Sequence, residues 1–263
     1  MKAKRFHYLY LLILIGALLI PVWGTLMYAI AGEWSRSILP DSWTLNWLSQ
    51  IWQDDRFIKS LWSSVAICVF TALLSIVVVF PVVLAVHINH PRWEKWLNVV
   101  LVLPFTLPPV VASVGILQLY THMLNSGLGT FIVLIGCYFT IVMPFVYRSL
   151  DNNFRSLNAK ELMDASALLG ASYWQSIVNV LLPNLKKGVI VAFFIAISFL
   201  MGEFVFINIL AGGYFETLQV YLYTLKNSSG HLSSAVVISY FVLLLILTGV
   251  VSWLSQEKKY VTD

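Results

Sequence analysis

Long uncharged runs alternate with short charged stretches along this chain. No Asp, Glu, Lys or Arg occurs between Phe6 and Gly32, or between Trp96 and Tyr147. A helix needs about 20 predominantly apolar residues to cross a bilayer, so the first run predicts one span and the second is long enough for two. The whole pattern predicts six spans, at about 8–30, 61–87, 97–121, 129–148, 188–211 and 232–254.

The composition of the chain agrees with this pattern. Of its 263 residues, 59% are hydrophobic and 11% are charged, whereas soluble proteins carry about 25% charged residues. The first run is much longer than the apolar core of a signal peptide, which has about 7–15 residues, so we expect a retained span. The sequence therefore predicts an all-α polytopic membrane protein, and its formal net charge of +4 gives no reason to expect a nucleic-acid partner.

The distribution of Lys and Arg orients the spans, because cytoplasmic loops carry an excess of these residues. If both termini lie inside, twelve of the 16 residues fall on the inner side: Lys2, Lys4, Arg5, Arg92, Lys95, Arg148, Arg155, Lys160, Lys186, Lys187, Lys258 and Lys259. The outer four are Arg36, Arg56, Lys59 and Lys226. The bias predicts that the termini and the loop between the fourth and fifth spans are cytoplasmic.

That loop contains an amphipathic stretch, residues 158–183, which predicts two short helices. Asn158 is a suitable N-cap for the first helix, with Glu161 at N3 as in a capping box. Gly170 stands where the chain would turn through the left-handed region, which glycine does without strain. Helical spacing groups small and apolar residues on one narrow face of the first helix: Leu162, Ala165, Ser166 and Leu169.

The second helix of this loop is predicted from Ser172 and Gln175, which match a second capping box. Pro183 prevents a simple continuation into the fifth span, because proline lacks an N–H and clashes with the preceding turn. The apolar face expected for this helix consists of Trp174, Ile177, Val178 and Leu181.

The same loop resembles the EAA motif of ABC importer permeases, E-A-A-x3-G-x9-I-x-L-P. The matching positions are Asp164, Ala165, Ser166, Gly170, Val180, Leu182 and Pro183. Every spacing agrees, and three positions carry conservative substitutes: Asp for Glu, Ser for Ala and Val for Ile. In that family the loop docks into a groove on a separate ATP-hydrolysing subunit, so the resemblance implies that these residues couple the chain to an ATPase.

The resemblance implies a six-helix type I ABC importer permease fold (MetI-like) in a bacterial inner membrane. Expected parts are an N-terminal helix with an outer segment (1–59), a permease core (60–254) with a cytoplasmic coupling loop (149–187), and a cytoplasmic tail (255–263). Expected partners are ABC ATPase subunits, a second permease subunit, identical or homologous, and an extracytoplasmic substrate-binding protein. ATP would bind to the ATPase, and the chain itself has no G-x-x-x-x-G-K-[ST] phosphate loop and no expected cofactor.

Glu203 is the one Asp, Glu, Lys or Arg expected at membrane depth. A carboxylate there costs a few kcal/mol, so it usually faces a partner or a water-filled path. We therefore take Glu203 as a candidate residue of the translocation pathway. The alternative is an acid that only holds helices together, and a membrane enzyme that uses Glu203 lacks a second titratable group at similar depth.

The remaining residues give weaker indications of chemistry. Cys68 and Cys137 both lie in apolar runs, so we expect core residues without a disulfide, and the five histidines have no metal-ligand spacing. The layout looks like the spermidine/putrescine permease group, which makes a polyamine the first substrate expected. Ferric iron, phosphonate, sulfate and thiamine are the alternatives, and a purely structural subunit would not explain the glycine turn at 170.

Overall fold

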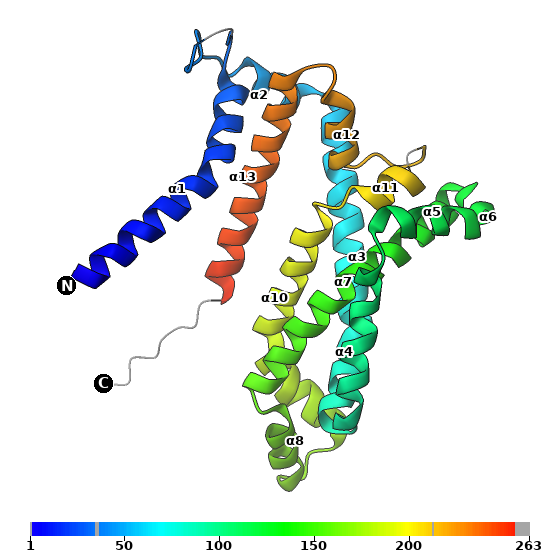
Figure 1. Cartoon of the computed structure of the whole chain (residues 1–263). Coiled ribbons are helices and arrows are strands. Elements are labelled where there is room, and N and C mark those ends of the chain that lie inside the picture. Colours follow the sequence, from blue (N-terminus) through cyan, green and yellow to red (C-terminus); the bar gives the residue numbers. More distant parts are fainter. Residues whose placement is uncertain (1, 35–36, 212, 256–263) are drawn as a thin grey trace. The chain divides into compact units, whose positions relative to one another are not determined.

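The regular secondary structure in the described part of the chain is helical, apart from one isolated bridge between Ala31 and Trp43. The computed structural model describes residues 2–34, 37–211 and 213–255, with side chains described for 7–34, 37–211, 213–250 and 252. The predicted cytoplasmic tail lies almost entirely outside these residues. Five of the described helices are long and apolar enough to cross a membrane, and one bent pair would make a sixth (Figure 1).

The long helices are α1 (Lys2–Ile30), α3 (Asp55–Ile88), α7 (Gly127–Ser156), α10 (Leu182–Leu200) and α13 (Gly230–Ser255). The short ones are α2 (Asn46–Gln53), α4 (Glu94–Val102), α5 (Pro109–Leu119), α6 (Thr121–Leu124), α8 (Ala159–Leu168), α9 (Tyr173–Gln175), α11 (Val205–Leu210) and α12 (Leu218–Leu225). Two 3-10 turns, Pro91–Trp93 and Leu103–Thr106, flank α4, and a π-helix, Ser176–Leu181, precedes α10.

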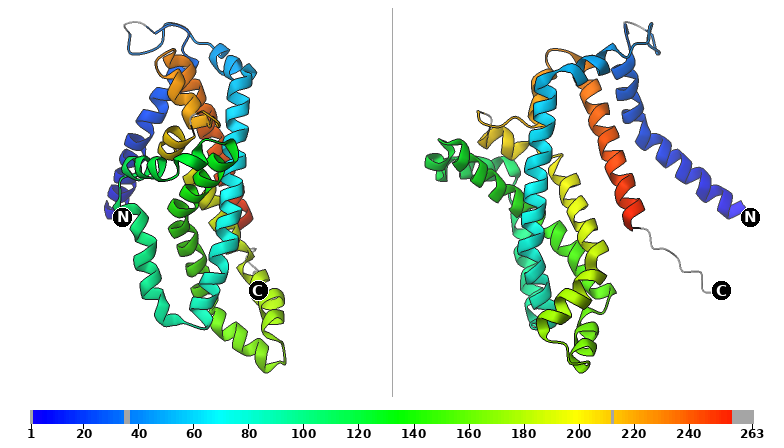
Figure 2. Two further views of the ribbon diagram at one scale, coloured as in Figure 1. Left: turned by 90° about the vertical axis from the view of Figure 1, so that its right-hand side faces the viewer. Right: turned by 180° about the vertical axis from the view of Figure 1, so that it is seen from behind.

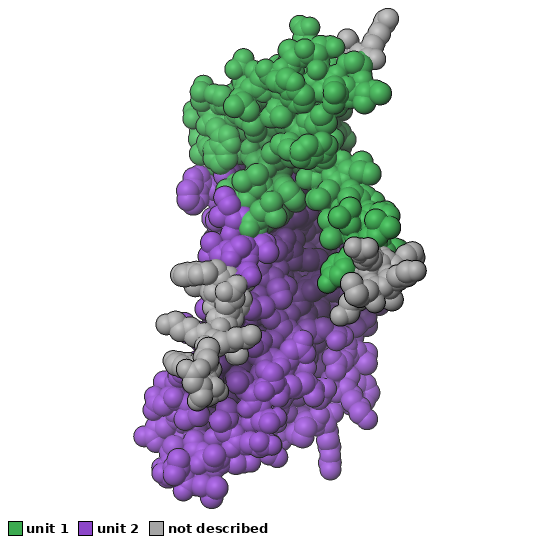
Figure 3. Space-filling view, turned by 90° about the vertical axis from the view of Figure 1, so that its left-hand side faces the viewer, with its two compact units in different colours: residues 1–60, 221–245 green, residues 61–220, 246–263 purple. Residues whose placement is uncertain are grey.

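The chain forms two compact units (Figure 3). One consists of residues 1–60 and 221–245, and the other of residues 61–220 and 246–263. The loop at 158–183, Glu203 and the bent helix pair all belong to the second unit.

The core of the second unit is built on buried residues spaced by four along α7 and by three or four along α10. On α7 these residues are Leu134, Tyr138, Val142, Val146, Leu150 and Phe154, and on α10 they are Leu185, Gly188, Ala192, Ala196 and Leu200. Residues four apart form a ridge along a helix, and such ridges interdigitate between helices. Small side chains let two helices approach closely. The approach is tightest at Gly188, where a Cβ would lie 2.0 Å from the Asn153 side chain.

Helix α3 buries a similar ridge, in which two positions carry hydroxyl groups. The Thr71 hydroxyl donates to the Ile67 carbonyl over 2.8 Å, and the Ser75 hydroxyl donates to the Thr71 carbonyl over 2.7 Å. Both hydroxyls are therefore satisfied by their own helix, as buried polar groups must be. Cys68 and Cys137 are buried and unpaired, which confirms the sequence prediction.

The third predicted span, at about 97–121, is broken in the structure. The segment Pro91–Thr106 and helix α5 meet at an angle of 88° (Figure 2). Leu107 and Pro108 both precede prolines and both take extended backbone, with ψ of 133° and 135°. Proline disfavours the helical conformation in the residue before it, so two successive X-Pro bonds stop the helix here.

The fifth predicted span is interrupted as well. Helix α10 ends at Leu200, α11 begins at Val205, and Glu203 lies in the four-residue gap between them. Helix α11 packs against α5, so the two broken spans meet in the same part of this unit.

The other unit is held by aromatic and polar contacts near the end of α1. The His231 ring stacks between Tyr28 and Trp47, with ring centroids 4.2 Å and 5.2 Å away. Tyr221 Oη donates to Asp54 Oδ2 over 2.6 Å. This bond favours the ionised carboxyl and lowers the pKa of Asp54 below its usual value.

Candidate functional site

Residues 158–183 form a helical hairpin at one end of the second unit, which is also the end where α3 leads into α4 (Figures 1 and 2). We call it the 158–183 hairpin. Asn158 does not cap its first helix, contrary to the prediction. It takes left-handed dihedrals (φ 48°, ψ 51°) and its side chain makes no cap hydrogen bond. Asparagine tolerates this conformation better than most residues, and here it reverses the chain between α7 and α8.

The buried face of α8 differs from the narrow face of small and apolar residues that the spacing indicates. Its buried residues are Ala159, Met163 and Ser166. Only Ser166 belongs to the predicted set, and Leu169 is 90% exposed. The buried face is therefore offset by about one residue around the helix from the face of small and apolar residues.

The turn after α8 was predicted correctly. Gly170 has φ 85°, its N–H donates to the Ala167 carbonyl over 2.9 Å, and the Ala171 N–H donates to the Ser166 carbonyl over 3.1 Å. These two bonds define a Schellman motif. Space around Gly170 is open, since a Cβ there would meet no atom within 4 Å. Glycine is thus required by the backbone conformation and not by crowding.

The second half of the hairpin starts with the predicted capping box. Ser172 and Gln175 each bind the other's backbone N–H. The chain then passes through the π-helix Ser176–Leu181 and continues directly into α10. The wider π turns give room to the Pro183 ring. The Asn184 side-chain amide donates to the Val180 carbonyl over 2.7 Å and satisfies it.

Two buried serines hold the halves of the hairpin together. The hydroxyls of Ser166 and Ser176 are 2.7 Å apart, and the side chains are 6% and 1% exposed. Ser176 also donates to the Ser172 carbonyl over 3.0 Å. Ser166 additionally lies 2.8 Å from the Met163 carbonyl. A buried pair of this kind fixes the angle between the halves, because a misplaced hydroxyl would be left without a partner.

The tip of the hairpin exposes large apolar side chains. Leu168 and Leu169 are 89% and 90% exposed, and Trp174 is 72% exposed. Leu169 belongs to the narrow face of small and apolar residues that the spacing indicates, whereas Leu168 does not. Both leucines adjoin the Gly170 turn, so they form one apolar patch.

The residues that match the EAA motif have different environments in this hairpin. Asp164, Ala165 and Gly170 are exposed, whereas Ser166 is buried. Leu182 and Pro183 are exposed at the start of α10, and Val180 is partly buried. Ser166 therefore acts through its bond to Ser176, and the exposed positions are available to a partner.

Glu203 is half-buried and stabilises the break in the fifth span. Its Oε1 accepts a hydrogen bond from the Phe206 N–H over 2.9 Å, which satisfies one of the free N–H groups at the start of α11. It also lines a cavity with Pro104, Phe105, Pro109, Phe199 and Gly202, which come from both broken spans. Glu203 is the one acidic or basic residue in that lining.

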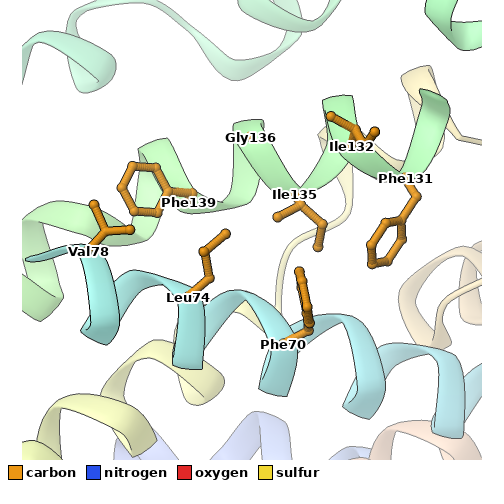
Figure 4. A pocket seen from close by; sticks show the side chains of 8 residues that line it. All are labelled: Phe70, Leu74, Val78, Phe131, Ile132, Ile135, Gly136 and Phe139. Carbon is orange, nitrogen blue, oxygen red and sulfur yellow. The ribbon is translucent and has the colours of Figure 1, made fainter. Parts of the chain in front are cut away.

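A second hollow, between α3 and α7, contrasts with the Glu203 cavity. Figure 4 shows Phe70, Leu74 and Val78 facing the α7 side chains that complete it. The α7 residues are Phe131, Ile132, Ile135, Gly136 and Phe139. A charged solute would find no polar group there, so this hollow suits only an apolar occupant. Nowhere in the described part of the chain do three His, Cys, Asp or Glu residues gather as a metal site would require.

The chain is similar in sequence to a family of transport proteins and to several of its members. Residues 78–260 match the family model described as the binding-protein-dependent transport system inner membrane component. The chain is 24% identical over 243 residues to a putative 2-aminoethylphosphonate transport system permease protein of Salmonella choleraesuis, covering 90% of this chain and 91% of that protein. It is 25% identical over 268 residues to a sulfate transport system permease protein of Escherichia coli K12, covering 92% of this chain and 86% of that protein.

The same fold occurs in a solved transporter. The structure is that of a bacterial alginate ABC transporter in complex with an alginate pentasaccharide-bound periplasmic protein. One of its chains superimposes with a TM-score of 0.74 at 16% identity, covering 97% of this chain and 95% of that chain. The predicted fold is thereby confirmed.

Proposed function

This chain belongs to the family of binding-protein-dependent transport system inner membrane components, and on that premise we propose that its 158–183 hairpin is the surface through which an ATPase drives transport. Its relatives are ABC importer permeases of the inner membrane and not enzymes. The chain is accordingly a permease subunit. A permease exposes its substrate path to each side of the membrane in turn, so its mechanism depends on how force reaches its helices.

One observation supports the coupling role most strongly. Leu168 and Leu169 are almost fully exposed on a hairpin that is otherwise fixed by a Schellman turn, a capping box and a buried serine pair. Exposed adjoining leucines on a rigid polar hairpin are typical of a protein-binding surface. The Lys and Arg bias predicts that this end of the unit is cytoplasmic, where an ATPase would meet it.

The hairpin is well built to transmit movement. It is joined to α7 on one side by Leu157 and Asn158, and on the other side it runs into α10 through the π-helix without a break. A displacement of the hairpin would therefore move both helices as rigid bodies. Rocking of bundles in this way opens and closes the substrate path in transporters of many kinds.

The complete importer would contain further subunits. We infer ABC ATPase subunits that bind ATP, a second permease subunit, and an extracytoplasmic substrate-binding protein. Both termini of this chain would face the cytoplasm. The permease parts would be the N-terminal helix and outer segment (1–59), the core (60–254) and the tail (255–263).

A small phosphonate is the substrate that the relatives favour. The aminoethylphosphonate permease and the sulfate permease both carry small oxyanions by name, and neither points to the polyamine that the layout suggested. Within the Glu203 cavity a carboxylate would attract the ammonium group of an aminophosphonate. In cells that depend on this permease, deletion of its gene should abolish 2-aminoethylphosphonate uptake. Loss of sulfate or spermidine uptake instead would contradict this assignment.

Glu203 would then line the translocation pathway as well as stabilise α11. Its place in a cavity between two broken spans supports this role. Glu203→Gln keeps the hydrogen bond to the Phe206 N–H but removes the charge. We expect slower uptake with an altered pH dependence. Unchanged uptake at every pH would leave only the structural role.

Disruption of the glycine turn tests the coupling role. Gly170→Trp places a large side chain at a left-handed position beside the leucine patch, so transport should be lost while the protein still inserts. Gly213→Trp is the control, because Gly213 also has open space but lies far along the sequence in the outer segment. Normal transport by Gly170→Trp would refute the coupling role.

A further inference from the structure

A network of ionisable side chains joins three helices at the hairpin end of the second unit. Arg155, on the last turn of α7, places Nη2 2.6 Å from Glu94 Oε1 on the first turn of α4. Its Nε donates to Asp151 Oδ2 over 3.0 Å. Asp151 Oδ1 lies 3.3 Å from Nε2 of His87, on the last turn of α3. Arg155 thus links α7 to α4 directly and to α3 through Asp151.

The inner members of this network are shielded from water. The side chains of His87 and Asp151 are 14% and 16% exposed, whereas those of Arg155 and Glu94 are 49% and 35% exposed. The His87 ring also packs on Phe154, whose side chain is fully buried, at a centroid distance of 5.4 Å. Isolated surface ion pairs contribute little, but networks with shielded members hold geometry better.

The place of Arg155 in the chain makes this network mechanically relevant. Helix α8 of the hairpin begins only four residues after Arg155, and Leu157 and Asn158 connect it to α7. Asn153, two residues before Arg155, packs against Gly188 of α10. The last turn of α7 is therefore the point where the hairpin, α10, α4 and α3 all meet.

We propose that Arg155 is a positioning residue that makes the cytoplasmic ends of α3, α4 and α7 move as one body when the hairpin moves. Its guanidinium acts through Glu94 and Asp151 and touches neither substrate nor ATP. This inference rests on the proposed coupling role of the hairpin. Without Arg155 the hairpin would still bind the ATPase, but its displacement would move α7 without α4.

The decisive readout is the number of substrate molecules imported per ATP hydrolysed by the complete transporter. Arg155→Gln should lower this ratio at least fivefold, with ATPase binding and hydrolysis retained. Arg155→Lys should have a ratio between those of Arg155→Gln and the wild type. Lysine keeps the positive charge but cannot hold Glu94 and Asp151 together with the forked geometry of a guanidinium. Arg148→Gln is the matched control, because Arg148 is an exposed arginine on the same helix, and its ratio should stay normal.

A double-mutant cycle tests whether Glu94 and Arg155 act on each other. Glu94→Gln should also lower the ratio, and the double variant should be no worse than the poorer single variant, since either change breaks the same contact. Additive losses would overturn the proposal. If Arg155→Gln fails to accumulate in the membrane, the import ratio of Glu94→Gln alone tests the proposal, because this variant breaks the same contact.

A crosslink distinguishes joint movement from opening. Cysteines at 94 and 155, in a background without Cys68 and Cys137, are joined by a short bis-maleimide. The crosslink should restore the import ratio that the two substitutions lower. Continued loss after crosslinking would mean that α4 and α7 must separate, and would overturn the proposal. If the ATPase fails to bind the wild-type hairpin at all, the proposed function fails instead, so the two failures are distinguishable.

Discussion

The leucine patch at the tip of the 158–183 hairpin gives the sharpest prediction about docking. Leu168→Ala combined with Leu169→Ala removes three carbon atoms from each of two side chains that are 89% and 90% exposed. Because they are so exposed in the isolated chain, their removal should not disturb the hairpin itself. Any effect should appear in the binding of a partner.

The size of the effect follows from the area that a partner would cover. Burial of one methylene contributes about 0.8 kcal/mol, so three carbons on each leucine amount to about 2 kcal/mol when fully covered. Two leucines covered at half to full extent correspond to about 2–4 kcal/mol. A tenfold change in affinity corresponds to about 1.4 kcal/mol, so the ATPase should bind roughly 30- to 1,000-fold more weakly.

The assay is equilibrium binding of the permease, in lipid nanodiscs, to the ATPase that copurifies with the wild-type protein. Ile38→Ala is the control, because Ile38 is 93% exposed in the outer segment and should not affect binding. ATPase affinity equal to wild type in the double variant would refute the docking role of the patch. Equal weakening by Ile38→Ala would show that the assay responds to general damage.

Three further predictions concern stability. Gly170→Ala should cost about 1–2 kcal/mol locally, because alanine is strained in the left-handed region, and thermal denaturation should show a lower Tm. Ser166→Ala should lower the free energy of unfolding by only about 1 kcal/mol, because the Ser176 hydroxyl keeps its hydrogen bond to the Ser172 carbonyl. An unchanged Tm would contradict the role of Ser166 in holding the two halves of the hairpin together. Hydrogen bonding by Tyr221 lowers the pKa of Asp54, so its contribution to stability is full above the unfolded pKa of about 3.9 and is lost as the pH falls through the lower folded value. Asp54→Asn should remove that acid dependence from the melting curve.

Much of the fold follows from local rules that the sequence displays. Uncharged runs predict spans because the bilayer excludes charge, and Gly170 and the Ser172–Gln175 box predict a turn and a helix start from short-range geometry. These features depend on a few neighbouring residues, so tertiary contacts did not change them.

The errors arose where several rules competed. Asn158 is both a good N-cap and tolerant of left-handed dihedrals, and the reversal between α7 and α8 required the second property. Pro108 and Pro109 indicated a break after Thr106, but the presence of two prolines does not determine the angle of 88° between the helical segments. The π-helix before Pro183 has no short sequence pattern of its own.

The candidate site was predicted in position more accurately than in detail. The spacing of Asp164, Gly170 and Pro183 located the hairpin, but helical periodicity assumes that apolar residues face inward. Leu168 and Leu169 break this assumption, because both are almost fully exposed, and the surface that we propose for them belongs to another polypeptide. Contacts between distant residues, such as that of Arg155 with Glu94, cannot be read from spacing at all.

The central claim is that a cytoplasmic ATPase holds the tip of the hairpin. Its most direct test is a photo-crosslinkable amino acid placed at Leu169 in the complete transporter in cells, with the same group at Ile38 for comparison. We predict a crosslinked product with a nucleotide-hydrolysing subunit from position 169 and none from position 38. Crosslinking of position 169 only to periplasmic proteins, or modification of it by a reagent that cannot cross the inner membrane, would contradict the claim.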